Sequence, residues 1–574
     1  MYQVRGLELH SSRMWSWDSV RRAVDFMVKA EMNALIFHEI NIIDHLQPQA
    51  GGVSTSLSRS YGIRYTYRHE SSENNIAYIN RVIELAHSNG IRFYFEVKEP
   101  SYPEELLRVH RELFSPEGQV CPTHPFWFEF LEKKIERLLE TVPDFDGIIE
   151  SACTAETKVS LMPLKERADK IFPSTDTPIT YCTCERCRGT KLSEWNTNIT
   201  MSLYRPLKKK GKQLVIRDFT YSPESQNAFL ESVETPKDVI ICLKNVPHDF
   251  YPTFPLNPRI GEVGDYDQWL EFDAWGQFFG LGVFPCILLD DMRDRLTHAQ
   301  ERDNRVKGYI CRADWELISE GWAMDSLNLI NLYGLAKQGK EIDYRYDDIF
   351  EYVLSLLEKG SIPFLGKPIK VENRGELATI ADLLLKTWPI IRGSLYIKDH
   401  VFQDNSLVLD SFELIRHMRT NLHPLPPWDP SRPDPLQNLD TSSLEDLIEE
   451  KARALREVRA IVGSLRQETL TLNIEINMSL LSLFEAFELY IEGFYHAGEA
   501  YLLTEYALLT KCAEDIKKAC QSAESLPVHA AKLKKHVVKY LYEPQSHVIS
   551  ILLDPQRFSR LHDSLLDALG CVSA

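Results

Sequence analysis

Val239-Ile240-Ile241-Cys242-Leu243 runs directly into Lys244-Asn245-Val246-Pro247-His248-Asp249-Phe250, and no other stretch of the chain is as informative. Its first five residues are apolar, which predicts a buried β-strand. An acid, Asp249, follows a few residues later. In α/β barrels the catalytic groups gather at the carboxyl ends of the strands. The stretch therefore predicts a barrel strand with Asp249 at its functional end.

A second acid stands at the distance expected for the next strand. Glu271, in Trp269-Leu270-Glu271-Phe272-Asp273, comes 271 − 249 = 22 residues after Asp249. Two carboxylates on neighbouring strand ends can share one water molecule and remove its proton. Glycoside hydrolysis needs such carboxylates together with an acid on the opposite side, which protonates the leaving oxygen. The two acids thus indicate glycosidase chemistry.

Short apolar runs alternate with longer amphipathic segments over about the first 330 residues. About eight such units match a (β/α)8 TIM barrel better than an open doubly wound sheet. The polar and aromatic residues 41–72 are expected to form a loop over the active face. We expect the catalytic barrel to span residues 1–335, with strands at residues 4–10, 33–39, 91–97, 145–151, 213–219, 238–245, 268–273 and 307–312.

The second half of the chain has a different pattern. Apolar residues recur there at helical spacing, and a proline-rich connector at residues 423–430 interrupts them. The whole chain is therefore expected to be of the α/β class, with the barrel followed by an all-α domain over residues 336–574. The helical stretches are expected at residues 349–357, 377–391, 444–465, 478–509 and 530–541.

Composition limits the possible functions. The chain has 574 residues, 44% of them apolar, and a formal net charge of −18. No block of basic residues is present to neutralise phosphates, so we expect no nucleic-acid partner. No apolar run approaches the ~18 residues of a membrane span, and no secretory signal is apparent. We therefore expect a cytoplasmic protein whose eleven cysteines stay reduced.

A third acid, Glu156, follows the fourth expected strand by a few residues and would share the barrel face of Asp249 and Glu271. Walled by apolar rings, such a carboxyl would have a raised pKa and could act as a general acid. Together with this acid, several islands within residues 30–340 resemble, in the same order, family-67 glycoside hydrolases, the α-glucuronidases. The islands are residues 33–41, residues 142–147 with Glu156, residues 216–221, residues 244–250, residues 270–272 and residues 328–336.

The resemblance implies an inverting, exo-acting glycosidase with a helical C-terminal domain. It gives Glu156 the role of general acid, and Asp249 and Glu271 the role of paired bases. In an inverting enzyme the acid and the base stand roughly 6.5–9.5 Å apart. The resemblance also suggests that Arg217 meets the carboxylate of the sugar, with Lys244 and Asn245 nearby.

The chain also departs from that family. It has no room for the family's N-terminal β-sandwich, and a lysine that helps to hold the uronate is replaced by Ala152, or by Ser151 if an extra loop residue is counted. The reaction class is therefore carried over more firmly than the sugar. Further candidates for substrate binding are His10 and Glu39, at the ends of the first two expected strands, and the ring of Trp269.

Cys182, Cys184 and Cys187 form a C-x-C-x-x-C cluster, a weak candidate for a metal site. Three thiolates at that spacing could bind zinc if Cys153 or a histidine supplied the fourth ligand. No second pair of cysteines follows at the spacing of a zinc finger. The alternative is a loop of reduced cysteines beside the pocket.

We therefore expect an enzyme that removes a terminal sugar, for instance α-linked glucuronic acid, from oligosaccharides. No organic cofactor is indicated, because neither a G-x-G-x-x-G turn nor a P-loop is present. The helical domain could carry a homodimer contact. One alternative is a retaining or substrate-assisted hexosaminidase that uses Asp290-Asp291. Others are a non-catalytic carbohydrate-binding barrel and a scaffold whose helical half has the main role.

Overall fold

The computed structural model describes residues 2–47, 66–103, 105–116, 118–151, 159, 161, 182, 184–231, 235–356, 362–365 and 369–571. The chain forms two compact units that are interleaved in sequence. One contains residues 1–249, 256–272 and 297–312, and the other contains residues 250–255, 273–296 and 313–574. The division into domains at residue 335 stays a prediction.

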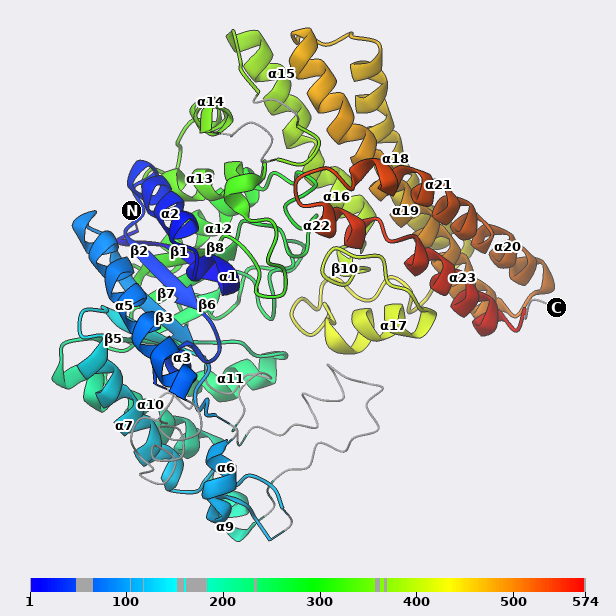
Figure 1. Ribbon diagram of the computed structural model, residues 1–574. Helices are drawn as coiled ribbons and strands as arrows, with labels where there is room; N and C mark the ends of the chain where they lie inside the picture. Colours follow the sequence, from blue (N-terminus) through cyan, green and yellow to red (C-terminus); the bar gives the residue numbers. More distant parts are fainter. Residues whose placement is uncertain are drawn as a thin grey trace. The chain divides into compact units, whose positions relative to one another are not determined.

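Eight parallel strands close into a barrel in the order β1 to β8, with β8 pairing back onto β1 (Figure 1). The predicted (β/α)8 fold is thereby confirmed, and each strand lies within two residues of its expected bounds at either end. The strands are β1 Val4–His10, β2 Ala34–His38, β3 Arg92–Val97, β4 Gly147–Glu150, β5 Gln213–Arg217, β6 Ile240–Lys244, β7 Gln268–Asp273 and β8 Val306–Arg312.

Helices alternate with these strands along the chain. Part of the segment expected to be a loop is helical. Ile42, Ile43 and Leu46 give α3 a buried apolar face, and the residues from Thr66 onward belong to α5. The helices of this half are α1 Ser11–Met14, α2 Trp17–Ala30, α3 Ile42–Leu46, α5 Thr66–Ser88, α6 Glu105–Val109, α7 Phe126–Thr141, α9 Glu185–Gly189, α10 Leu192–Lys209, α11 Pro223–Glu231 and α12 Leu289–Arg302, with a 3-10 turn at Arg111–Leu113.

The interior of the barrel is filled by side chains from all eight strands. Tyr94 and Trp269 are the largest and meet edge to face, with ring centroids 5.5 Å apart. Gly147 and Gly308 make room for them, since a Cβ atom at either position would lie within about 3.1 Å of these rings. Such alternation of large and small residues is how a barrel fills its interior. This core consists of Val4, Ala34, Ile36, Tyr94, Ile149, Val215, Cys242, Trp269 and Ile310.

The C-terminal part of the chain is helical, as predicted, apart from the hairpin of β9 Tyr396–Ile397 and β10 His400–Val401. Asp440 and Asn473 cap the two longest helices by accepting hydrogen bonds from backbone N–H groups of the first turn. The helices are α13 Leu329–Gln338, α14 Tyr346–Leu356, α15 Arg374–Leu385, α16 Thr387–Leu395, α17 Phe412–His417, α18 Thr441–Arg466, α19 Ile474–Thr510, α20 Ala513–Ala523, α21 Ser525–Tyr540, α22 Ser546–Leu552 and α23 Pro555–Leu569, with a 3-10 turn at Ala323–Asp325 and a π-helical turn at Met418–Leu422.

The longest of these helices, α19, packs against α18 and α20, and α21 packs against α23. Although α19 is rich in apolar residues, no helix among the described residues is both long and apolar enough to cross a membrane.

Candidate active site

A polar layer covers the barrel core at the carboxyl ends of the strands. Side chains on a strand alternate between its two faces, so the residue two positions beyond a core residue also points inward. On seven strands the residue two positions beyond the core residue is polar. On β1 the core residue is Val4, the residue two positions beyond it is Gly6, and the next inward-facing residue is the polar Glu8. The polar layer consists of Glu8, His38, Glu96, Ser151, Arg217, Lys244, Glu271 and Arg312, all buried.

The register of the strands places members of this layer side by side. His38 on β2 pairs in register with Glu96 on β3, and Lys244 on β6 pairs with Glu271 on β7. Glu8 on β1 pairs with Arg312 on β8. Barrel closure therefore gathers three acids and three cations from six different strands. This is the end of the barrel at which enzymes of this fold carry out catalysis.

Arg217 stands among the acids of the layer. Its Nε and NH2 groups donate to the two carboxylate oxygens of Glu271 at 2.6 and 2.7 Å, and its Nε also lies 3.1 Å from Glu96. Its NH1 group donates to Ser151 at 3.2 Å. A bidentate pair of this kind fixes both side chains. Arg217 is thus bound to Glu271, and its contact with the carboxylate of a sugar, which the resemblance implies, stays a prediction.

Glu8, His10 and His38 form a second buried group. Glu8 Oε1 lies 2.7 Å from His38 Nδ1 and 2.9 Å from His10 Nε2, and the two histidine nitrogens are 3.0 Å apart. Burial by itself would raise the pKa of Glu8, but the charges and hydrogen bonds of the two histidines outweigh it and bring that pKa well below its usual value. One ligand atom of each residue lies within 4.8 Å of the others, so the three could hold a divalent cation.

Glu96 differs from the acids around it. Burial, and then the negative charge of Glu8, raise the pKa of Glu96 well above its usual value, and Arg217 only partly offsets them. Arg217 makes its two shortest contacts with Glu271, so it compensates the charge of Glu96 less completely. A carboxyl with a raised pKa holds its proton to higher pH than an ordinary acid, and while protonated it can donate a hydrogen bond.

Asp249 is held differently, just beyond β6. The preceding residue, His248, has a positive φ of 71°, a conformation that is rare outside glycine, asparagine, aspartate and histidine. Lys244 Nζ donates to Asp249 Oδ1 at 2.9 Å, and the Asp249 side chain is 17% exposed. Burial alone would raise the pKa of Asp249, but the charge of Lys244 outweighs it and lowers that pKa to about 2. Asp249 is therefore an ionised carboxylate that solvent can reach.

Cations from three strands surround the ring of Phe219, just past β5. Lys244 Nζ is 3.5 Å from the ring centroid, Arg217 Cζ is 5.4 Å from it and Lys98 Nζ is 6.0 Å from it. All three cations are buried. A buried cation is costly unless it has an anionic partner, and the carboxylates of Glu271 and Asp249 supply such partners to Arg217 and Lys244.

The structure describes two of the three predicted catalytic acids. Asp249 and Glu271 lie at the ends of neighbouring strands, as expected. Glu271, however, is fully buried in its pair with Arg217. Glu156 lies outside the described residues. Glu150, at the end of β4, accepts a hydrogen bond from the backbone N–H of Glu99. The carboxylate of Glu99 in turn pairs with Lys134 on α7, outside the barrel.

The predicted binding residues also differ in their surroundings. Asn245 is mostly buried, and its backbone N–H donates to the carbonyl oxygen of Glu271 at 2.9 Å. Glu39 accepts a hydrogen bond from Trp15 at 3.2 Å and pairs with His45. Trp269, in contrast to its predicted role, lies in the barrel core with 1% exposed, because its position on β7 is one inward step below Glu271.

Asp290 and Asp291, the acid pair of the hexosaminidase alternative, lie in the first turn of α12. Asp290 accepts from the Tyr346 hydroxyl at 2.5 Å and pairs with Arg293, and Asp291 pairs with Arg295 one turn later. The Asp290 side chain is 66% exposed. These contacts are typical of a helix surface.

Sequence reasoning missed Glu96 and Lys98. Both lie on or just after β3 with the same parity as Tyr94, so strict alternation along this strand would have placed them in the inward-facing set. Without the barrel register, however, the acid in Arg92–Val97 has no visible partner, because Arg217 is more than a hundred residues away.

Comparisons with known proteins bear on the fold. No protein-family model matches the sequence, and a search of curated proteins found no match. Among solved structures, the chain is similar to a GH138 enzyme targeting pectin rhamnogalacturonan II, with 12% identity and a TM-score of 0.58 over 92% of this chain and 62% of that one. The chain thus spans about three fifths of that enzyme's chain.

A second similar structure is a mutant of the Thermobaculum terrenum O-GlcNAc hydrolase, with 14% identity and a TM-score of 0.45 over 99% of this chain and 97% of that one. This second similarity is too weak to support a conclusion. At 12% identity, the similarity to the GH138 enzyme concerns the fold alone. It shows that this chain shares its fold with a glycoside hydrolase.

Proposed function

We propose that this chain is an exo-acting glycoside hydrolase whose active site is the polar layer together with Asp249. The observation that carries the proposal is the state of Asp249: an ionised, partly exposed carboxylate, oriented by Lys244 and placed at the carboxyl end of a barrel strand. A base in glycoside hydrolysis must be ionised and must reach a water molecule. Of Asp249 and Glu271, the two predicted catalytic acids that the structure describes, Asp249 is the one that is both ionised and exposed to water.

In the proposed reaction Asp249 removes a proton from water as the water attacks the anomeric carbon. Glu156 donates a proton to the leaving oxygen, and the glycosidic bond breaks with inversion. Glu271 has a positioning role, because its two oxygens are bound by Arg217. An ionised base and an acid that holds a proton are what this chemistry needs.

The proposed substrate is an oligosaccharide that ends in a sugar with a carboxylate, such as α-linked glucuronic acid. Arg217, Lys244 and Lys98 around Phe219 support this choice, as does Arg312 in the same layer. A carboxylate would be attracted by this group of cations, and Lys or Arg binds such an anion with charge-assisted hydrogen bonds.

The test is a screen of the purified protein against aryl glycosides and uronic-acid oligosaccharides. We expect hydrolysis of a uronide by the wild type and not by Asp249→Asn. The matched control is Asp265→Asn, the same change at an exposed aspartate that pairs with Arg305. NMR of the first product should show inversion at the anomeric carbon. Absence of turnover on every substrate, or full activity in Asp249→Asn, would refute the proposal.

A further inference from the structure

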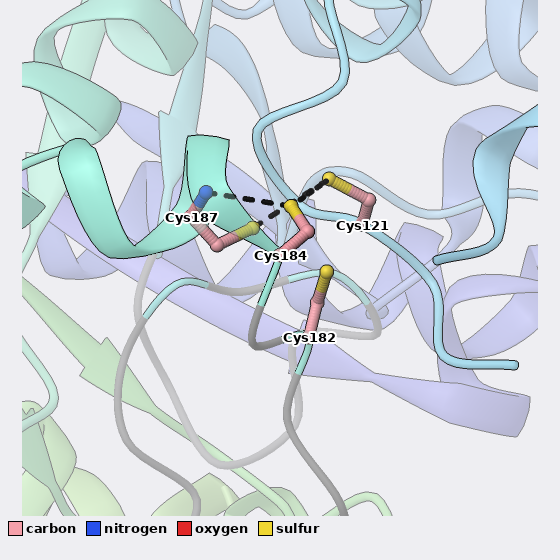
Figure 2. Close-up of side chains that lie close together, drawn as sticks. All are labelled: Cys121, Cys182, Cys184 and Cys187. Carbon is pink, nitrogen blue, oxygen red and sulfur yellow. Dashed lines mark hydrogen bonds between the residues drawn. The ribbon is translucent and has the colours of Figure 1, made fainter. Parts of the chain in front are cut away.

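Four cysteine thiols meet in a place that the proposed reaction does not use. Cys121 lies between the 3-10 turn Arg111–Leu113 and α7, while the other three come from the segment around α9 (Figure 2). The sulfur atoms of Cys121, Cys182, Cys184 and Cys187 all lie within 4.8 Å of one another. Cys121 thus occupies the position that sequence reasoning assigned to Cys153 or a histidine. Cys153 lies outside the described residues.

The distances between the sulfur atoms fit a metal centre. Cys121 Sγ lies 3.7 Å from Cys184 Sγ and 3.5 Å from Cys187 Sγ. Four sulfurs about 2.3 Å from a tetrahedral zinc ion stand about 3.8 Å from each other. A disulfide would instead bring two sulfurs to about 2.05 Å. The spacing is therefore that of thiolates arranged around an ion.

The cluster is also built into the fold. The backbone next to Cys121 is fixed by two buried tryptophans: Trp127 Nε1 donates to the Cys121 carbonyl at 3.0 Å, and Trp195 Nε1 donates to the Pro122 carbonyl at 2.9 Å. The Cys187 backbone N–H donates to Cys184 Sγ at 3.5 Å, and the Thr123 hydroxyl lies 3.1 Å from Cys187 Sγ. Such hydrogen bonds orient metal ligands and stabilise thiolate charge.

We propose that Cys121, Cys182, Cys184 and Cys187 bind one structural zinc ion. Four thiolates favour zinc, complete its tetrahedral coordination and leave no open position for a substrate, so the role is structural. Binding converts four thiols and Zn2+ into a tetrathiolate complex and releases the four protons to solvent. The ion would join the chain between β3 and α7 to the chain between β4 and α10.

The experiment measures metal in the full-length protein, purified under reducing conditions without chelator. Mass spectrometry of the metal content should give about one zinc per chain. Cys121→Ser should hold less than about half an equivalent. The matched control is Cys512→Ser, the same change at an exposed cysteine outside the cluster, which should keep the zinc content of the wild type.

A second measurement does not depend on how the variant folds. Wild-type protein stripped of metal and titrated with Co2+ should show the intense thiolate-to-cobalt charge-transfer band and visible bands of a tetrahedral site, saturating at one equivalent. A metal held by Glu8, His10 and His38 would lack the thiolate band. Three results would each overturn the proposal: less than half an equivalent of zinc with no thiolate–cobalt band, wild-type zinc content in folded Cys121→Ser, or a disulfide among the four cysteines in freshly purified protein.

Discussion

Two carboxylate–cation pairs stand on neighbouring strand ends of the barrel, and they are built for different purposes. Arg217 contacts both oxygens of Glu271, and neither side chain is more than 3% exposed. Lys244 contacts one oxygen of Asp249, whose side chain stays 17% exposed. In the sequence the two acids look like equivalent partners. In the structure Glu271 is fixed inside the layer, whereas Asp249 is partly exposed.

The difference shows that the type of cation matters as much as the acid. The planar guanidinium of an arginine binds both oxygens of a carboxylate, whereas the ammonium group of a lysine is a compact charge that here contacts one oxygen. The first arrangement organises a site, and the second lowers the pKa of a base without blocking it. The following predictions test whether the two pairs really differ in this way.

The largest effect is expected from Arg217→Met. The change leaves Glu271 and Glu96 buried without their cation, and breaking a buried pair by removing one partner costs about 3–5 kcal/mol. Chemical denaturation followed by circular dichroism measures the loss. The double variant Arg217→Met/Glu271→Leu should recover part of it, because one unpaired charge is gone. A loss below about 0.5 kcal/mol would mean that the pair does not hold the layer together.

Asp249→Asn should affect activity and leave the fold intact. Removing a general base lowers kcat by at least ~100-fold, which corresponds to about 2.7 kcal/mol in the barrier. Steady-state kinetics on the substrate found in the screen provide the test, with thermal unfolding as a check on the fold. If Asp249→Asn loses as much stability as Arg217→Met while its folded fraction stays active, the two pairs do not differ in the way described here.

Lys244→Met should move a pH profile. Burial raises the pKa of Asp249, but Lys244, the strongest of the groups that lower it, helps to bring that pKa to about 2 from an ordinary value of 3.8, so its removal raises the pKa. The base must be ionised, and the acidic limb of kcat/KM therefore shifts to higher pH, by roughly 1–3 units. Lys244→Arg keeps the charge and should leave the limb near its original position. If the acidic limb does not shift in Lys244→Met, the ionisation seen in that limb does not belong to Asp249.

The smallest effect is expected from Asp290→Asn. Asp290 is an exposed acid paired on a helix surface, and such pairs contribute about 0–1 kcal/mol. Activity should change by less than about twofold, and the unfolding free energy by no more than about 0.5 kcal/mol. A loss of activity as large as that of Asp249→Asn would instead favour the hexosaminidase alternative, in which Asp290-Asp291 carries the reaction.

Much of the barrel could be predicted from the sequence, because its strands are short apolar runs with clear polar boundaries. β1 and β7 lie where the pattern puts them, at Val4–His10 and Gln268–Asp273. The pattern fails between β2 and β3: α5 begins at Thr66, and its first two turns have few apolar residues to reveal a helix. There the local composition resembles that of a loop.

The partners within the site were harder to predict than its members. The sequence places Asp249 and Glu271 on adjacent strand ends, yet it cannot show that Arg217 joins one of them, because that contact needs the barrel to close with a particular register. Cys121 is a similar case. It precedes Cys184 by 184 − 121 = 63 residues, far beyond the spacing of a local metal motif. Contacts of this kind are set by tertiary structure alone.

The stretch of chain from β4 to the cysteine cluster has a consequence for how this protein can evolve. Residues 152–181, which include Glu156, connect Ser151 at the end of β4 to Cys182 in the cluster, so this segment begins at a barrel strand and ends at the four cysteines. The entropy lost by closing such a segment grows slowly, by only about 0.6 kcal/mol for each doubling of its length. Insertions and deletions between these two attachment points are therefore inexpensive. The length of this segment could therefore change while the eight strands keep their sequence.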